Sequence, residues 1–284
     1  MQFNSVKVAC FSPTGTTKAV AVAIAGGLGS GRMDVIDATR PETRARPLRV
    51  GESDLLVIAV PVYMGRVPDL VGEWLNAIEA RNTPTVCAVV YGNRAFEDAL
   101  LELKDIMIGR GCIPVAGAAF IGEHSFSSAE APVAAGRPDQ NDLALAKAFG
   151  QSVRRKLQAF SSPRDVPIVD VPGNHPYNGD TKTRDIDFIE VNDWCDQCGV
   201  CIDACPAGAI DQQDPRVIDV AACITCCACI KLCPNAARTM KPGPIMDVAI
   251  RLNRLCDTPK APEYFLQGGV LAAHWAADTG PSAE

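Results

Sequence analysis

The sequence has little positive charge, no long apolar run and no export signal. Its formal net charge is -6 at pH 7, and it contains no block of Lys and Arg, which argues against nucleic acid and anionic membranes as partners. No apolar run reaches the ~18 residues that a membrane span needs. The first residues, MQFNSVKVACF, lack a basic segment followed by an apolar one. We therefore expect a cytoplasmic protein without a membrane span.

Several motifs of nucleotide-binding and hydrolytic proteins are missing as well. There is no G-x4-G-K-[ST] loop, and no dinucleotide fingerprint follows a strand-like run. The stretch GGLGSG at 26–31 follows a helix-like segment, so we interpret it as a helix end. The residue six positions after Cys10 is Thr16, where a cysteine phosphatase would have arginine. No triad, paired-carboxylate or metal-hydrolase pattern is present in the loops, so any substrate would have to react at a bound cofactor.

Residues 6–160 alternate apolar, strand-like runs with amphipathic stretches. This alternation is typical of a parallel sheet that is covered by helices on both faces. It predicts strands at 6–11, 32–37, 55–60, 85–90 and 112–120, and helices at 17–28, 67–80, 95–111 and 139–160. We expect a doubly wound, five-stranded α/β sheet of order 2-1-3-4-5, with ligands at the carboxyl ends of the strands.

The rest of the chain divides by composition. Residues 161–187 contain four prolines, which predicts an extended linker that covers the surface of a domain. Residues 188–240 hold most of the cysteines, and residues 241–284 form a tail with one helical stretch at 245–256. We therefore predict an α/β domain at 1–160, a linker, a small cysteine-rich domain and a tail.

Nine of the 13 cysteines lie in two runs, CDQCGVCIDACP and CITCCACIKLCP. Both follow the spacing C-x2-C-x2-C-x3-C-P, in which the first three cysteines bind one iron-sulfur cluster and the fourth binds the other. We predict a small α+β ferredoxin domain with two 4Fe-4S clusters. One predicted cluster takes Cys195, Cys198, Cys201 and Cys233, and the other takes Cys205, Cys223, Cys226 and Cys229.

Zinc is the alternative metal for these runs, because C-x2-C pairs also bind zinc. Eight cysteines with crossed spacing and a proline after each run favour clusters instead. Cys227 does not fit the spacing, and we interpret it as a buried thiol in preference to a ligand.

A second site is predicted where the first strand runs into CFSPTGTTKAV. Hydroxyl and backbone N–H groups at a helix N-terminus can bind a phosphate, and the alternative is a capping turn without a ligand. The third and fourth strands run into PVYMGRVP and YGNRAFEDAL, which brings glycines and aromatic residues to the same edge. A flat ring could lie there against Tyr63 or Tyr91, with contacts from Gly65, Gly92 and Asn93.

These three loops resemble the FMN site of flavodoxins. The whole chain, including YGNR, EHSFS and GRPDQND, resembles the EFR1-type ferredoxin/flavodoxin fusion proteins of anaerobes. The resemblance implies a flavodoxin-like fold that binds FMN, with the flavin N5 facing Met64 and Gly65 and with Arg94 in the third loop. It places the phosphate at Ser12, Thr14, Gly15, Thr16 and Thr17. The tail departs from the family, because CDTPKAPEYF stands where a more basic segment is usual.

Two functions fit this pattern. In the first, the chain carries electrons between two 4Fe-4S clusters and FMN and exchanges them with a redox partner protein, such as a ferredoxin or an oxidoreductase. In the second, FMN acts on a small molecule and the clusters supply electrons. We favour the carrier, and we see no output domain for a redox sensor. His124 could donate a proton, but a structural role is the preferred interpretation.

Overall fold

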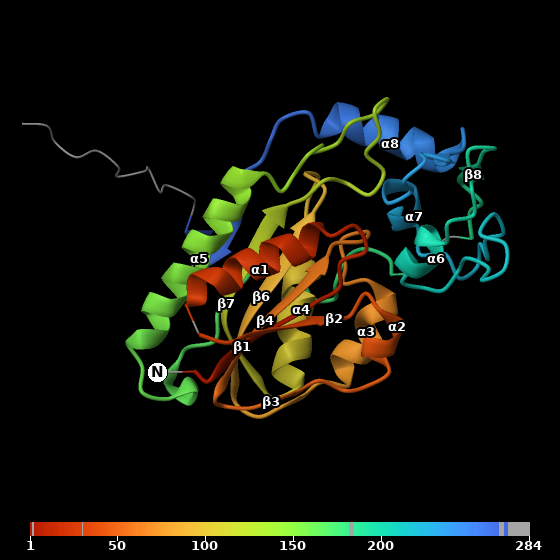
Figure 1. Ribbon diagram of the computed structural model, residues 1–284. Coiled ribbons are helices and arrows are strands. Elements are labelled where there is room, and N and C mark those ends of the chain that lie inside the picture. The colour runs from red at the N-terminus through yellow and green to blue at the C-terminus, as the bar shows by residue number, and fades with distance from the viewer. Residues whose placement is uncertain (2, 30, 182–184, 267–269, 272–284) are drawn as a thin grey trace, which may run out of the picture.

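The structure is a computed structural model in which residues 1, 3–29, 31–181, 185–266 and 270–271 are described. Its larger part is a twisted sheet whose five parallel strands stand in the predicted order (Figure 1). These strands are β1 (Ser5–Cys10), β2 (Met33–Asp37), β4 (Asp54–Pro61), β6 (Thr83–Tyr91) and β7 (Cys112–Ile121). The prediction of a doubly wound α/β sheet is therefore confirmed.

Apolar side chains alternate between the two faces of the sheet, as the period of two in a strand requires. In β4, Leu55, Val57 and Ala59 pack on one face, while Leu56, Ile58 and Val60 pack on the other. The first face is covered by α1 (Thr16–Leu28) and α5 (Gln140–Gln158), and the second by α3 (Asp69–Asn76) and α4 (Ala99–Gly109). The central strands are buried on both faces, which explains their continuous apolar runs.

The sheet is wider than expected, because the chain returns to it near its C-terminal end. Strand β10 (Glu263–Phe265) pairs antiparallel with β7, and β11 (Val270–Leu271) pairs with β10. The five-stranded prediction is corrected to a seven-stranded mixed sheet. An uncovered β7 would expose a row of unpaired backbone groups, and β10 satisfies them while burying Phe265. The rest of the predicted tail, 267–269 and 272–284, lies outside the described residues.

Short elements complete the fold. The larger part also contains α2 (Pro41–Arg44), β3 (Arg49–Val50), β5 (Glu79–Ala80) and the 3-10 turn η1 (Pro163–Asp165). The cysteine-rich part contains β8 (Ile189–Val191), α6 (Val200–Ala204), α7 (Ala228–Lys231) and β9 (Arg238–Met240), followed by α8 (Pro244–Leu255). No helix in the described ranges is long and apolar enough to cross a membrane.

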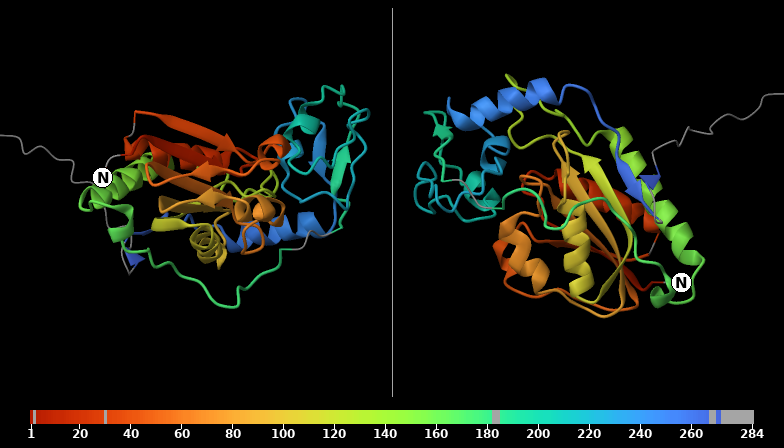
Figure 2. Two further views of the ribbon diagram at one scale, coloured as in Figure 1. Left: turned by 90° about the horizontal axis from the view of Figure 1, so that it is seen from below. Right: turned by 180° about the vertical axis from the view of Figure 1, so that it is seen from behind.

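The segment between the two parts lies on the larger one without forming a strand (Figure 2). The N–H of Val169 donates to the carbonyl of Pro114, and the Tyr177 hydroxyl donates to Asp105 of α4 at 2.7 Å. The carboxylate of Asp98 accepts bonds from the backbone of Asn174 and Asn178. These contacts fix the path of the chain into the cysteine-rich part.

Two glycines let α1 and α5 approach very closely. A Cβ atom on Gly27 would lie 2.0 Å from the carbonyl oxygen of Lys147, and one on Gly150 would lie 2.0 Å from that of Ile24. Gly26, the neighbour of Gly27, has no atom within 4 Å of such a Cβ. The backbones of α1 and α5 are therefore in direct contact at these two glycines. This contact fixes the position of α1 relative to α5.

Gly27→Ala should destabilise the protein by about 1–3 kcal/mol, because the new methyl group forces two backbones apart. The matched change Gly26→Ala should stabilise it by up to ~1 kcal/mol through helix propensity. Urea unfolding followed by circular dichroism measures both. Equal effects of the two substitutions would show that the helices are not in backbone contact.

Candidate functional site

A cavity of about 520 Å³ opens at the carboxyl ends of the parallel strands. It brings together all three loops that the sequence singled out, as the strand order requires. From the first loop come Thr14, Thr16 and Thr17, from the second Tyr63, Met64 and Gly65, and from the third Tyr91, Gly92 and Arg94. Ser12, Gly15 and Asn93 are predicted site residues that do not line it.

The first loop turns directly into α1. Gly15 adopts a left-handed conformation (φ 85°) and its N–H donates to the carbonyl of Ser12, while the Ser12 hydroxyl accepts from the N–H of Lys18. Ser12 therefore shapes the loop from inside. The Thr17 hydroxyl is buried without a hydrogen-bond partner among the described residues. An unpaired hydroxyl beside free helical N–H groups fits a phosphate, because both would donate to it.

The second loop is a tight turn from Tyr63 to Arg66, whose backbones exchange two hydrogen bonds of 3.0 Å. Both central residues have positive φ, 53° at Met64 and 82° at Gly65, which is the conformation of a type I′ turn. Arg66 anchors the turn through a two-pronged, largely buried ion pair with Glu102 of α4. The Met64–Gly65 backbone is thereby held at the cavity.

The two tyrosines differ in how they meet the cavity. Tyr91 is only 4% exposed, and its ring packs against Phe96 at 5.6 Å, so most of the ring belongs to the core although the residue lines the cavity. Tyr63 is half-buried at the cavity. Burial, together with the neighbouring Cys226 and Cys227, raises the pKa of Tyr63 well above its usual value. Of the two candidates, Tyr63 is the more exposed to a ligand in the cavity.

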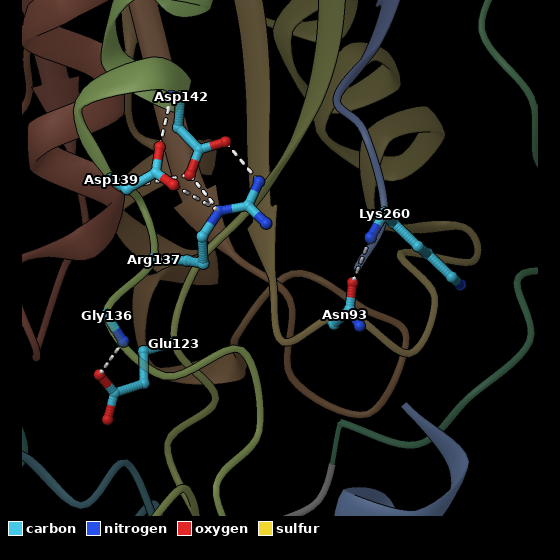
Figure 3. A network of polar contacts seen from close by, with 7 residues as sticks. All are labelled: Asn93, Glu123, Gly136, Arg137, Asp139, Asp142 and Lys260. Atoms are coloured by element: carbon cyan, nitrogen blue, oxygen red, sulfur yellow. Dashed lines mark hydrogen bonds and ion pairs between the residues drawn. The ribbon is translucent and has the colours of Figure 1, made fainter. Parts of the chain in front are cut away.

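Asn93 holds the tail and does not contact the cavity. Its amide nitrogen donates to the carbonyls of Cys256 and Thr258, and its oxygen accepts from the N–H of Lys260 at 3.0 Å (Figure 3). Asn93 is buried and left-handed (φ 61°), a backbone state that asparagine tolerates better than most residues. The structure thus gives Asn93 a role in holding the tail, and its predicted role at the cofactor stays a prediction.

A fourth loop, which follows β7, was not assigned to the site from the sequence. Gly122, Glu123, His124, Ser125 and Phe126 line the cavity. The Glu123 carboxylate accepts the N–H of Gly136 at 3.0 Å, and Arg137 pairs with Asp142 at the start of α5 (Figure 3). These bonds join the two ends of the loop to each other and to α5, and they hold the residues after β7 at the cavity.

His124 anchors this loop in its neutral form. Its Nδ1 accepts the N–H of Phe126 at 3.0 Å, which places the proton of the neutral ring on Nε2. Burial and the nearby charges of Lys231 and Arg94 lower the pKa of His124 to about 4. A Cβ atom on Gly92 would lie 2.2 Å from the ring, so the third loop packs directly on it. This geometry favours the structural role over a proton donor.

Three further segments line the cavity, and no sequence pattern predicts their position. They contribute Gly179, Asp180 and Thr181 from the segment that connects the two parts (the connecting segment), Ile245, Val248, Arg251 and Leu252 from α8, and Ile224 and Thr225 from the second cysteine run. The sequence of an amphipathic helix or an extended segment does not show which surface it covers. Only the folded structure places these residues beside the loops.

The structure gathers cysteines in two groups that each take members from both runs, and the two ligand sets stay a prediction. Cys195, Cys198, Cys201 and Cys233 line one small void, which we call the first quartet. Cys205, Cys223, Cys226 and Cys229 are close enough to influence one another's charge, and we call them the second quartet. The last cysteine of each run makes the same contact. The N–H of Ala209 donates to Cys205 Sγ, and the N–H of Ala237 donates to Cys233 Sγ, both at 3.3 Å.

The quartets fit 4Fe-4S clusters, because the four thiolates of each quartet can bind the four irons of a cubane. Arg238 is 2% exposed, lines the void of the first quartet and leaves Nη1 without a described partner. A buried, unpaired guanidinium needs a negative neighbour, and a thiolate-ligated cluster is one.

Cys227 is not a member of either quartet, and its main feature is its backbone conformation. It begins α7 with φ 58°, and Gly199 begins α6 with φ 79°, so the two residues are equivalent in the repeat. Its side chain is buried, with Sγ 3.7 Å from the carbonyl oxygen of Thr225. The geometry agrees with a buried thiol.

The 4Fe-4S dicluster domain family matches residues 188–234. Among solved structures, an archaeal flavodoxin is 18% identical over 54% of this chain and 99% of its own (TM-score 0.37). Flavodoxin 2 from Bacillus cereus is 14% identical over 54% and 99% (0.38), and the Flv1 flavodiiron core from Synechocystis is 17% identical over 56% and 37% (0.38). A search of curated proteins found no match.

The strand order and the dicluster match together define the class of this protein. The chain joins a flavodoxin-like domain to a ferredoxin-type domain that binds 4Fe-4S clusters. Such a combination serves iron-sulfur and flavin electron transfer.

Thr16→Ala should weaken FMN binding by about tenfold to a hundredfold, because a hydrogen bond to a charged group contributes ~1.5–3 kcal/mol. Riboflavin, which lacks the phosphate, should bind the variant and the unaltered protein equally. Fluorescence titration of the flavin-free protein measures both ligands. Thr239→Ala, at an exposed position of β9, is the control. An equal loss for FMN and riboflavin would place the phosphate elsewhere.

Proposed function

We propose that this chain is an iron-sulfur flavoprotein that carries electrons between two 4Fe-4S clusters and one FMN, and onward to or from a redox partner protein. One observation carries the proposal: the second cysteine run forms part of the wall of the cavity. Ile224 and Thr225 line the same space as Thr14 and Thr16 of the first loop. A flavin in the cavity would therefore lie beside the cysteine-rich part.

The cavity supports FMN as the flavin. Thr14, Thr16 and Thr17 offer three hydroxyl groups at the start of α1, where the helix dipole also favours a phosphate. A volume of about 520 Å³ lies within the range of single small-ligand sites. Tyr63 would contact the ring, and the Met64–Gly65 turn would present its backbone to the ring edge.

The residues around the cavity would bind the flavin, orient it and exclude water. Bound FMN takes up one or two electrons, whereas each 4Fe-4S cluster takes up one. The neutral ring of His124 holds the third and fourth loops together without adding charge. The connecting segment and α8 cover the remaining sides through Gly179 and Val248, and this cover favours a protein that hands on electrons within the chain.

The alternative is an FMN-dependent oxidoreductase that acts on a small molecule. Such a molecule would have to react at the flavin itself, because the loops contain no triad, paired-carboxylate or metal-hydrolase pattern. The second cysteine run in the cavity wall favours the carrier over this alternative.

The charge of the cysteine-rich part suggests the kind of partner. Residues 188–240 contain seven acidic and three basic side chains, and the clusters add further negative charge. A redox partner with a basic surface would meet this part faster at low salt, because salt screens the attraction.

Reduced ferredoxin should reduce the bound FMN rapidly, and NADH and NADPH should not. The reason is that no dinucleotide fingerprint follows any strand, while the one phosphate loop serves FMN. Anaerobic stopped-flow absorbance of the holoprotein with each reductant measures this. Added salt should slow the reaction with ferredoxin.

A variant with Cys201→Ala and Cys229→Ala, which lacks one ligand in each quartet, is the control. It should keep FMN and lose rapid reduction by ferredoxin. Fast reduction by NADH or NADPH that persists in this variant would make the protein a flavin reductase.

A further inference from the structure

We infer that the two quartets act in a fixed order, with the second quartet next to the flavin and the first quartet receiving electrons from outside. This inference rests on the proposed function and adds the route of the electrons to it. Sequence spacing treats the two runs as equals, and only their placement on the flavodoxin-like domain distinguishes them.

The second quartet faces the cavity. Ile224 and Thr225, which lie between its ligands Cys223 and Cys226, line the cavity, and Ile224 also packs against the core of the flavodoxin-like domain. Tyr63 lines the same cavity and, like Ile224, packs against the core of the flavodoxin-like domain. Only a short protein layer therefore separates the second quartet from the space for the flavin ring.

The first quartet lies farther from the cavity wall and is more exposed. No residue of the first cysteine run lines the cavity, whereas Ile224 and Thr225 of the second run do, and Cys198 is exposed while Cys226 and Cys229 are buried. Trp194, which directly precedes Cys195, is 69% exposed. A partner protein can therefore approach the first quartet closely, and it cannot reach the second quartet as closely.

The two quartets share one buried core, with Arg238 beside the first. Arg238 lines the void of the first quartet, and Cys201 of the first quartet and Cys229 of the second belong to the same cluster of buried residues. The Nη2 of Arg238 donates to the carbonyl of Pro215, which fixes the side chain. The quartets are thus adjacent, and a single route leads from the exposed one to the cavity.

Lys231 positions the second quartet on the flavodoxin-like domain. It stands between Cys229 and Cys233 in the sequence, and its ammonium group donates to the Glu123 carboxylate at 2.5 Å and to the carbonyl of Ser127 at 3.0 Å. Both acceptors belong to the fourth loop of the cavity. A second contact between the two parts is made by Arg44 of α2, which donates to the carbonyl of Pro206 at 2.5 Å.

The electron balance of this route is simple. A one-electron protein donor is oxidised and the cluster of the first quartet is reduced, and the electron then passes to the cluster of the second quartet and to FMN. Two such transfers, with two protons taken from water, reduce one FMN fully. No bond between heavy atoms forms or breaks.

Electron paramagnetic resonance of the half-reduced holoprotein tests this order. A reduced cluster speeds the magnetic relaxation of a half-reduced flavin, and the effect falls steeply with distance. Cys198→Ala should remove one cluster and leave the relaxation of the flavin signal close to that of the unaltered protein. Cys223→Ala should remove the other cluster and abolish most of the enhancement. Iron and flavin counts confirm what each variant holds.

The reverse pattern, with the enhancement lost in Cys198→Ala and kept in Cys223→Ala, would overturn the order. This failure is distinct from failure of the proposed function, which would appear as missing iron or missing FMN in the unaltered protein.

An exchange of the charges of Lys231 and Glu123 provides a second test of the order, for the case that the Cys223→Ala variant assembles no cluster at all. Lys231→Glu should place two carboxylates opposite each other, move the second quartet away from the cavity and reduce the enhancement while iron and FMN stay bound. Adding Glu123→Lys should restore it. An enhancement unchanged in Lys231→Glu would contradict the position of the second quartet.

Discussion

The contact between the cysteine-rich part and the loop after β7 is the constraint on which the rest of the structure depends. Lys231 reaches the carboxylate and carbonyl groups of this loop, and Ala131 of the same loop packs inside the cluster of apolar residues around Cys201 and Cys229. The Lys231–Glu123 ion pair is partly buried, with 20% and 29% of the two side chains exposed, and the apolar contact of Ala131 adds to it. Together these contacts hold the two parts in one relative position, which the proposed electron transfer between them requires.

The segments on either side of the cysteine-rich part also hold it in position. The connecting segment is fastened to α4 by Asp98 and Asp105, and the chain after α8 is fastened by Asn93 before β10 enters the sheet (Figure 2). Both chain ends of the small part are thus tied to the large one. Because these same segments also line the cavity, the contacts that fix the position of the small part also form the wall of the proposed flavin site.

The sequence predicts the parallel strands and the crossed quartets, because a period of two and a fixed cysteine spacing are local signals. It also predicts the three loops, since strand order places them at one edge. It could not predict that Asn93 binds the tail, because its partners lie more than 160 residues away. Nor could it place Glu123 opposite Lys231 or find β10, whose three residues are too few for a periodic pattern.

The central claim is that one chain holds a flavin and two clusters as a single electron route. The most direct measurement is an anaerobic count of iron, sulfide and released flavin in the purified protein, together with its absorbance spectrum. The account predicts about eight irons, eight sulfides and one FMN per chain. Zinc in place of iron, or FAD released on denaturation, would contradict it.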